Sequence, residues 1–162
     1  MNAMSPATVY SIDSSALIHG WRRAYPPRNF APFWTRVEAL IGQRRLRASV
    51  EVFNELERKD DDIYKWCKAR RADFFVEIDD GIQEHLRHIM GAYPRLTDTS
   101  TGRSGGDPFV IALARNYNPP LTVVSEENPG KKNSPKIPDV CRLEGILCIR
   151  LVELIQELDW RF

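Results

Sequence analysis

Four carboxylates stand at points where short apolar runs of the chain meet predicted helices. Asp13 follows TVYSI, Glu55 lies within VEVFNELER, Asp107 precedes FVIALA, and Glu127 comes two residues after LTVVS. Like charges a few ångströms apart repel one another, so a cluster of carboxylates persists when a divalent cation compensates it. Oxygen ligands favour Mg²⁺ or Mn²⁺ over zinc, and Mg²⁺ keeps several waters for reaction. Gathered in one place, these acids would indicate metal-assisted phosphate chemistry.

The elements that must position the acids follow from the hydrophobic pattern. Short β-branched or apolar runs predict strands, whereas apolar residues three and four apart predict amphipathic helices. We expect strands over 8–12, 46–49, 74–78, 121–125 and 146–149. Helices are expected to begin at 14 and to cover 30–41, 50–58, 60–68, 82–90, 108–114, 138–144 and 151–158. This alternation predicts an α/β domain with a parallel sheet.

Such a sheet would bring the acids to one edge. In open parallel sheets the functional crevice lies beyond the carboxyl ends of the strands, where Asp13 and Glu127 follow their strands. Asp107 is followed by Pro108 and a helical pattern, which predicts a helix N-terminus on the same rim. Glu55 would reach over from a neighbouring helix. Taken singly, Asp13 and Asp107 are also explained as helix caps, and only the joint pattern favours a site.

Composition narrows the class of protein. The length of 162 residues fits one domain, expected over 1–162 with residues 1–6 disordered and a mobile surface loop over 96–106. With 23 Lys+Arg and 22 Asp+Glu the net charge is +1, so no global field attracts nucleic acid. Three cysteines without a C-x-x-C pair indicate neither a disulfide framework nor a zinc site. No apolar run approaches the roughly 20 residues of a membrane span, so we expect a cytoplasmic protein without a membrane partner.

Four motifs, in order, resemble those of the PIN-domain nucleases. They are YSIDSSALI, VFNELE, GGDPFVIALA and VVSEE, and the resemblance runs from about Tyr10 to Leu154. It is closest to the toxin-like group that includes VapC. The resemblance implies a PIN-like three-layer α/β/α sandwich with a central, mostly parallel sheet of four to five strands. It also implies that Asp13, Glu55 and Asp107 are metal ligands, with Ser125 as a supporting hydrogen-bonding residue.

Two features depart from that family pattern. The family usually has Asp two positions after the hydroxyl residue, whereas this chain has Glu127. In addition, KIPDVCRLEGI resembles a PIN-like branch with an IPDVC segment, in which Asp139 would replace or supplement Glu127 as the fourth acid. Both alternatives stay open at this point.

The resemblance implies hydrolysis of RNA phosphodiester bonds at an Mg²⁺ or Mn²⁺ site, with Asp13, Glu55, Asp107 and Glu127 as catalytic residues. It further implies the toxin of a type II toxin–antitoxin pair, with a cognate antitoxin and a homodimer as partners. One alternative is a degenerate PIN-like binding protein. Another is a phosphotransferase that forms an aspartyl-phosphate. Those enzymes usually begin with D-x-D, whereas here the residue two positions after Asp13 is Ser15, which counts against this alternative. Basic residues expected to contact RNA are Arg22, Arg23, Arg28, Arg103, Lys131, Lys132 and Lys136.

Overall fold

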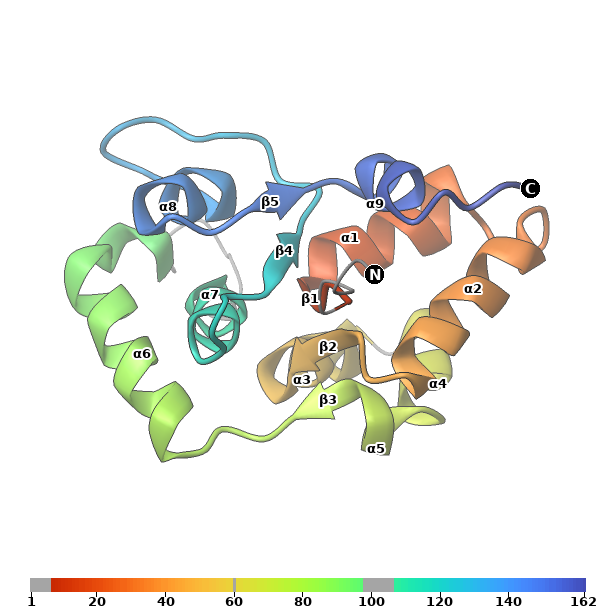
Figure 1. Cartoon of the computed structure of the whole chain (residues 1–162), viewed down its shortest axis with the longest axis horizontal. Helices are drawn as coiled ribbons and strands as arrows, with labels where there is room; N and C mark the ends of the chain where they lie inside the picture. Colours follow the sequence, from red (N-terminus) through yellow and green to blue (C-terminus); the bar gives the residue numbers. More distant parts are fainter. Residues whose placement is uncertain (1–6, 60, 98–106) are drawn as a thin grey trace, which may run out of the picture.

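A computed structural model describes residues 7–59, 61–97 and 107–162. The predictions for residues 1–6, for Arg103 and for most of the loop over 96–106 therefore lie outside the described residues. Five strands form a sheet in the order β3-β2-β1-β4-β5, and every pair of neighbours is parallel (Figure 1). Their bounds are β1 Tyr10–Ile12, β2 Leu46–Ser49, β3 Phe75–Val76, β4 Thr122–Val124 and β5 Cys148–Ile149.

Helices cover both faces of this sheet, with α6 and α7 on one side and α2 and α9 on the other (Figure 1). The predicted three-layer α/β/α sandwich is confirmed. A π-helical turn over Gly20–Ala24 extends α1, and a 3₁₀ turn over Pro94–Thr97 follows α6. The helix bounds are α1 Ser14–His19, α2 Ala31–Gly42, α3 Val50–Lys59, α4 Asp62–Lys68, α5 Arg71–Phe74, α6 Asp80–Ala92, α7 Asp107–Arg115, α8 Ile137–Glu144 and α9 Leu151–Glu157.

The predicted strands over 74–78 and 146–149 were too long. Phe74 is the last residue of the short helix α5, which the sequence pattern did not predict. Only Phe75–Val76 therefore pairs with β2. Before β5, Gly145 adopts a positive φ of 70° that ends α8, and the N–H of Ile146 bonds back to a carbonyl of that helix. A left-handed residue of this kind is a common helix terminator, and it delays the start of the strand.

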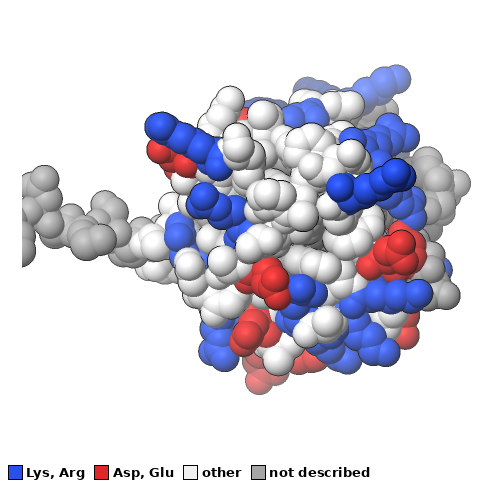
Figure 2. Space-filling model, turned by 90° about the vertical axis from the view of Figure 1, so that its right-hand side faces the viewer, with Lys and Arg blue, Asp and Glu red and all other residues white. Residues whose placement is uncertain are grey.

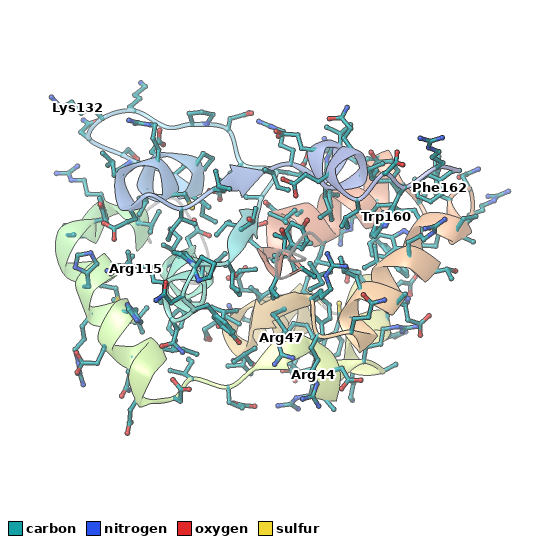
Figure 3. All side chains as sticks on the ribbon, viewed as in Figure 1. Arg44, Arg47, Arg115, Lys132, Trp160 and Phe162 are labelled. Atoms are coloured by element: carbon teal, nitrogen blue, oxygen red, sulfur yellow. The ribbon has the colours of Figure 1, made fainter. Side chains whose placement is uncertain are left out.

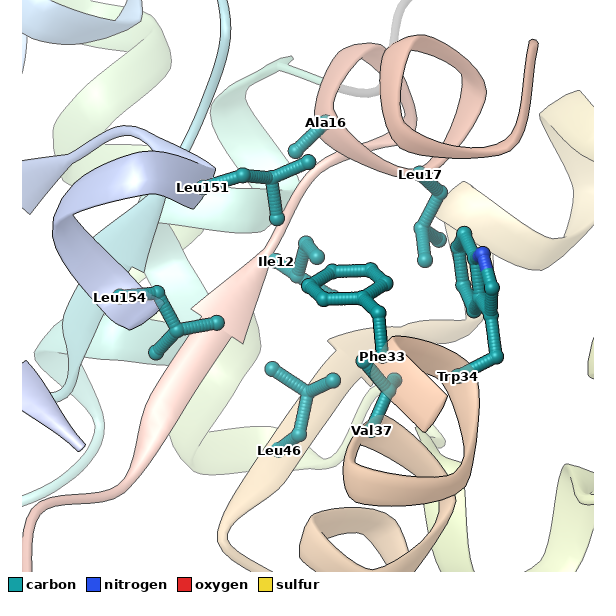
Figure 4. A pocket seen from close by; sticks show the side chains of 9 residues that line it. All are labelled: Ile12, Ala16, Leu17, Phe33, Trp34, Val37, Leu46, Leu151 and Leu154. Carbon is teal, nitrogen blue, oxygen red and sulfur yellow. The ribbon is translucent and has the colours of Figure 1, made fainter. Parts of the chain in front are cut away.

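The core is apolar and closely packed on the side of α2 and α9. The aromatic residues Phe33 and Trp34 of α2 are buried in this core. Figure 4 shows the Phe33 ring beside Ile12 and near Leu46 of the sheet, and the Trp34 ring beside Leu17 of α1. The cavity left between them measures about 10 Å³, and its lining is apolar. A void of this size without polar partners stays dry and offers no ligand site.

Charge on the surface is mixed. Figure 2, which shows the side of α2 and of the C-terminus, has Lys and Arg interspersed with Asp and Glu among uncharged side chains. Several of these charges pair with each other, as Arg70 does with Glu38 at 2.9 Å. Among the residues that the structure describes, no helix has the length and apolar character needed to cross a membrane.

Candidate functional site

Asp13 lies at the carboxyl end of β1 and caps helix α1. Its Oδ1 accepts hydrogen bonds from the backbone N–H of Ala16 at 3.0 Å and from Ser15 Oγ at 2.7 Å. Its Oδ2 accepts a hydrogen bond from Ser125 Oγ at 2.8 Å. The residue is only 2% exposed. A strand that ends in an extended Asp followed by a helix therefore places a carboxylate inside the rim of the sheet.

Burial governs the ionisation of Asp13. Removal from water raises its pKa from 3.8 to about 7, although hydrogen bonds from Ser15, Ala16 and Ser125 lower the value. The negative charge of Glu127 raises the pKa further, so this second acid lies close enough to act on Asp13. Among the described residues, no Lys, Arg or His forms an ion pair with Asp13. The carboxyl thus changes charge near neutral pH, where a cation would favour its ionised form.

Glu55 brings a second buried carboxylate into contact with Ser14, the residue that follows Asp13. It lies in α3, which directly follows β2, and is 4% exposed. Its Oε2 accepts a hydrogen bond from Ser14 Oγ at 2.7 Å. Ser14 donates to Glu55 and Ser15 donates to Asp13, so consecutive residues in the first turn of α1 hold the two carboxylates. Helix α3 starts where β2 ends, so Glu55 belongs to the same rim of the parallel sheet.

Asp107 is the first residue of α7, and it is partly buried. Ser11 Oγ of β1 donates to the carbonyl of Val110 at 3.0 Å, and the N–H of Leu121, just before β4, bonds to the carbonyl of Ala114. The helix therefore runs opposite to the strands, and its N-terminus lies toward their carboxyl ends. Within the described part of the chain, however, no three His, Cys, Asp or Glu side chains converge as a metal site.

Glu127 and Asp139 differ in what their carboxylates contact. Glu127 Oε1 accepts the N–H of Ile137 at 3.2 Å, at the start of α8, while its charge acts on Asp13. Asp139 Oδ2 accepts the N–H groups of Gly130 at 2.7 Å and Lys136 at 2.9 Å. Asp139 therefore closes the loop before α8 and caps that helix. Of these two acids, Glu127 is the one whose charge acts on Asp13.

A pair of serines clamps Asp13, and one of them was missed from sequence. Ser15 Oγ donates to Asp13 and accepts the N–H of Glu126 at 3.1 Å. Ser125 Oγ likewise donates to Asp13 and accepts the N–H of Glu127 at 3.1 Å. Each hydroxyl thus joins one oxygen of the carboxylate to the backbone after β4. The position of Ser15 in the first turn of α1 was the available signal.

Glu126 is a second residue whose part was not foreseen. Its Oε2 accepts the N–H of Leu151 at the start of α9, at 2.9 Å. Its Oε1 lies 3.4 Å from His19 Nε2 and 3.8 Å from an Arg150 nitrogen. This side chain links the segment after β4 to α1 and α9. It therefore helps to fix the backbone N–H groups that donate to Ser15 and Ser125.

The comparisons with known proteins place the chain in a family and a fold. A family model described as "Domain of unknown function (DUF4411)" matches residues 10–162. The chain belongs to that family. No curated protein matches it. One similar solved structure is that of VapBC2 from Rickettsia felis bound to a DNA fragment from their promoter, with a TM-score of 0.55 and 10% identity over 88% of this chain and 98% of that chain. Because the identity is only 10%, this likeness shows the fold alone, which is PIN-like and of the VapC type.

Of the basic residues predicted to contact RNA, Arg103 lies outside the described residues, Lys136 is partly buried, and the others are exposed. Arg22 forms an ion pair with Asp61 in the turn before α4. Arg23, Lys131 and Lys132 are exposed. Contact with RNA stays a prediction for all of them.

Proposed function

We propose that this DUF4411 chain is a metal-dependent endoribonuclease of the PIN type. The observation that carries the proposal is the pair of buried carboxylates, Asp13 and Glu55, held by consecutive residues on the carboxyl rim of a parallel sheet. Among the described residues, neither acid forms an ion pair with Lys, Arg or His. Burying a carboxylate without a cationic partner is unfavourable, so a bound cation would offset the cost of burying both acids.

The residues at this rim suit a hard divalent ion. Their donor atoms are oxygens, as Mg²⁺ and Mn²⁺ prefer. Asp13 and Glu55 would hold the ion, with Asp107 and Glu127 contributing from the same rim. Because no three acids converge in the described residues, Asp107 or Glu127 has to approach Asp13 when the ion binds. The bond between Glu127 and the N–H of Ile137 is the contact that such a movement would break.

The bound ion would activate a water and neutralise charge that develops on the phosphorane oxygens. The chain supplies the orientation of its ligands. Ser15 and Ser125 hold the two oxygens of Asp13, and Ser14 holds Glu55, so little reorganisation remains at the moment of reaction. RNA phosphates would be bound by basic side chains around the rim, in contacts that weaken as salt rises.

We further propose that the enzyme is the toxin of a type II toxin–antitoxin pair. The similar solved structure is a VapBC2 assembly, and VapC belongs to the toxin-like PIN group that the sequence motifs resemble. On this proposal the chain forms a homodimer and binds a cognate antitoxin that blocks the acidic rim.

Cleavage of a labelled single-stranded RNA with Mn²⁺ tests the proposed activity. Asp13→Asn should reduce the rate more than about 100-fold, since changes to residues that merely orient metal ligands already cost about 10- to 100-fold. Asp79→Asn is the matched control, because Asp79 also caps a helix, by accepting the N–H of Ile82 at 2.8 Å, but is exposed. Wild-type activity in Asp13→Asn would refute the proposal.

A second candidate function is a PIN-like binding protein without turnover. It is favoured by the contact of Glu127 with α8 and by the lack of three converging acids in the described residues. In that case the wild-type chain would bind no Mn²⁺ and would leave RNA intact under all conditions in which it is folded.

A further inference from the structure

A hollow of about 310 Å³ lies apart from the four acids. One wall is the end of α6 and the 3₁₀ turn after it, and the other is the loop between β4 and α8. The side chains that matter here are Tyr93, Pro94 and Arg95 on the first wall and Lys132 and Pro135 on the second. Figure 3 shows Lys132 at the outer end of its loop, beyond α8. The hollow thus combines flat apolar surfaces with positive charge.

A hydrogen bond to Glu144 holds Tyr93 in place. Its hydroxyl donates to Glu144 Oε2 at 2.5 Å. Glu144, whose side chain is 11% exposed, also lies 2.9 Å from His88 Nε2 and 3.4 Å from Arg115 Nε. Burial and the bond to Glu144 raise the pKa of Tyr93 to about 12, so the hydroxyl stays protonated and keeps donating. The ring is therefore fixed before any ligand arrives, which lowers the entropy lost on binding.

The positive charges at the hollow are available. Arg95 and Lys132 are exposed and, within the described ranges, neither forms an ion pair. The negative charge of Glu144 lies beneath Tyr93 and is engaged by Arg115. An anion placed between the two walls would meet both cations. Together with a fixed aromatic ring and two prolines, this set matches a phosphate joined to a flat, unsaturated ring.

We propose that this hollow binds one nucleotide of a single-stranded RNA, with the base against Tyr93 and the flanking phosphates at Arg95 and Lys132. The inference rests on the proposed ribonuclease function and adds a substrate subsite to it. The loop that carries Lys132 begins at Ser125 and Glu127, so one strand of RNA can follow that loop from the acidic rim to the hollow. Base stacking of this kind is tolerant of sequence.

The two cations are tested together by RNA affinity. The probe is a fluorescein-labelled 12-nucleotide single-stranded RNA, and its affinity for the full-length Asp13→Asn chain is measured by fluorescence anisotropy without added metal. Adding Arg95→Ala and Lys132→Ala should weaken binding at least about tenfold and flatten the plot of log affinity against log salt by about 1.4, at about 0.7 for each phosphate contact. The control is Arg36→Ala with Arg161→Ala, which removes two exposed charges elsewhere.

The ring is tested by two substitutions of the same residue. Tyr93→Leu should weaken RNA binding about fivefold or more, whereas Tyr93→Phe loses the bond to Glu144 but keeps the ring, and should weaken binding less than Tyr93→Leu does. Circular dichroism melts establish that each variant is folded. If Tyr93→Leu fails to fold, the two-cation comparison decides alone. Equal affinity of the Leu and Phe variants, or a two-cation loss no larger than that of the control, would overturn the subsite.

The outcomes separate the subsite from the nuclease. If wild-type protein cleaves RNA while the hollow variants bind as the control does, the subsite is wrong and the nuclease proposal stands. If the hollow variants lose binding but wild-type protein never cleaves, the nuclease proposal is wrong and the RNA subsite stands. If the parent chain binds no RNA, the subsite is wrong, and the nuclease proposal is wrong as well if wild-type protein cleaves none.

Discussion

Asp13→Asn should make the protein more stable at alkaline pH while abolishing its activity. Burial raises the pKa of Asp13 from 3.8 to about 7, so the folded chain holds this proton more tightly than the unfolded chain does. The wild-type protein therefore loses stability as the pH rises from about 4 to about 7. At about 1.4 kcal/mol per pH unit, the full loss is about 4 kcal/mol.

Asparagine carries no charge and has nearly the shape of aspartate. Its side-chain oxygen can still accept the N–H of Ala16 and the hydroxyl of Ser15, while the hydroxyl of Ser125 rotates to accept from the new amide group. That rearrangement offsets part of the gain. We therefore expect Asp13→Asn to exceed wild type by up to about 4 kcal/mol at pH 8, and the difference to shrink toward zero near pH 4.

The measurement is the free energy of unfolding by urea in the presence of a chelator, at several values between about pH 4 and pH 8. Asp79→Asn serves as the control for altering a helix cap that is exposed. The reasoning is refuted if Asp13→Asn is less stable than wild type at pH 8, or if the difference between them does not depend on pH.

Three further substitutions test the contacts around the rim and the hollow. Ser125→Ala removes a donor to Asp13, and we expect urea unfolding to show a loss of about 1–3 kcal/mol. Asp139→Ala removes a helix cap, so stability should fall by about 1 kcal/mol while calorimetric Mn²⁺ affinity stays unchanged. Burial raises the pKa of Glu144, but the hydrogen bond from Tyr93 and the nearby His88 and Arg115 outweigh burial and lower the pKa overall. The ionised carboxylate therefore stabilises the fold at neutral pH, and this stabilisation is lost in acid. Glu144→Gln should therefore cost about 1–3 kcal/mol at pH 7 and less at low pH, as measured by thermal melts.

Each of these three has an outcome that contradicts it. A Ser125→Ala chain as stable as wild type would mean that its hydroxyl contributes no net stabilisation. Loss of Mn²⁺ affinity in Asp139→Ala would make that residue, and not Glu127, the fourth acid. An equal cost of Glu144→Gln at neutral and acid pH would exclude a contribution from its charge.

Local patterns were enough to predict most of the elements that carry the acids. A buried strand followed by Asp and two serines specifies an N-cap, and Asp107 before Pro108 specifies a helix start, because capping depends on a few consecutive residues. The rim position of these acids then follows from the parallel sheet. By contrast, the run around Phe74 and Phe75 predicted one strand, since periodicity cannot tell a short buried helix from a strand.

The hydrogen bonds that join the region around Asp13 to the segment after β4 could not be predicted from the sequence, because these segments lie far apart in the chain. Ser15 meets the N–H of Glu126 across 111 positions of the chain. The choice between Glu127 and Asp139 depends on how the loop before α8 closes, which its Pro, Gly and Lys residues do not specify. In the closed loop Asp139 is engaged by the backbone of Gly130 and Lys136.

On the proposed mechanism, the buried carboxylates share one site that a hard divalent ion neutralises. Titration of Mn²⁺ into the metal-free protein by isothermal calorimetry tests it most directly, with Asp13→Asn and the exposed-cap variant Asp79→Asn beside wild type. We predict saturable binding by wild type and Asp79→Asn, and loss of that binding in Asp13→Asn. Equal binding by all three chains, or no binding by the folded wild type, would contradict the account.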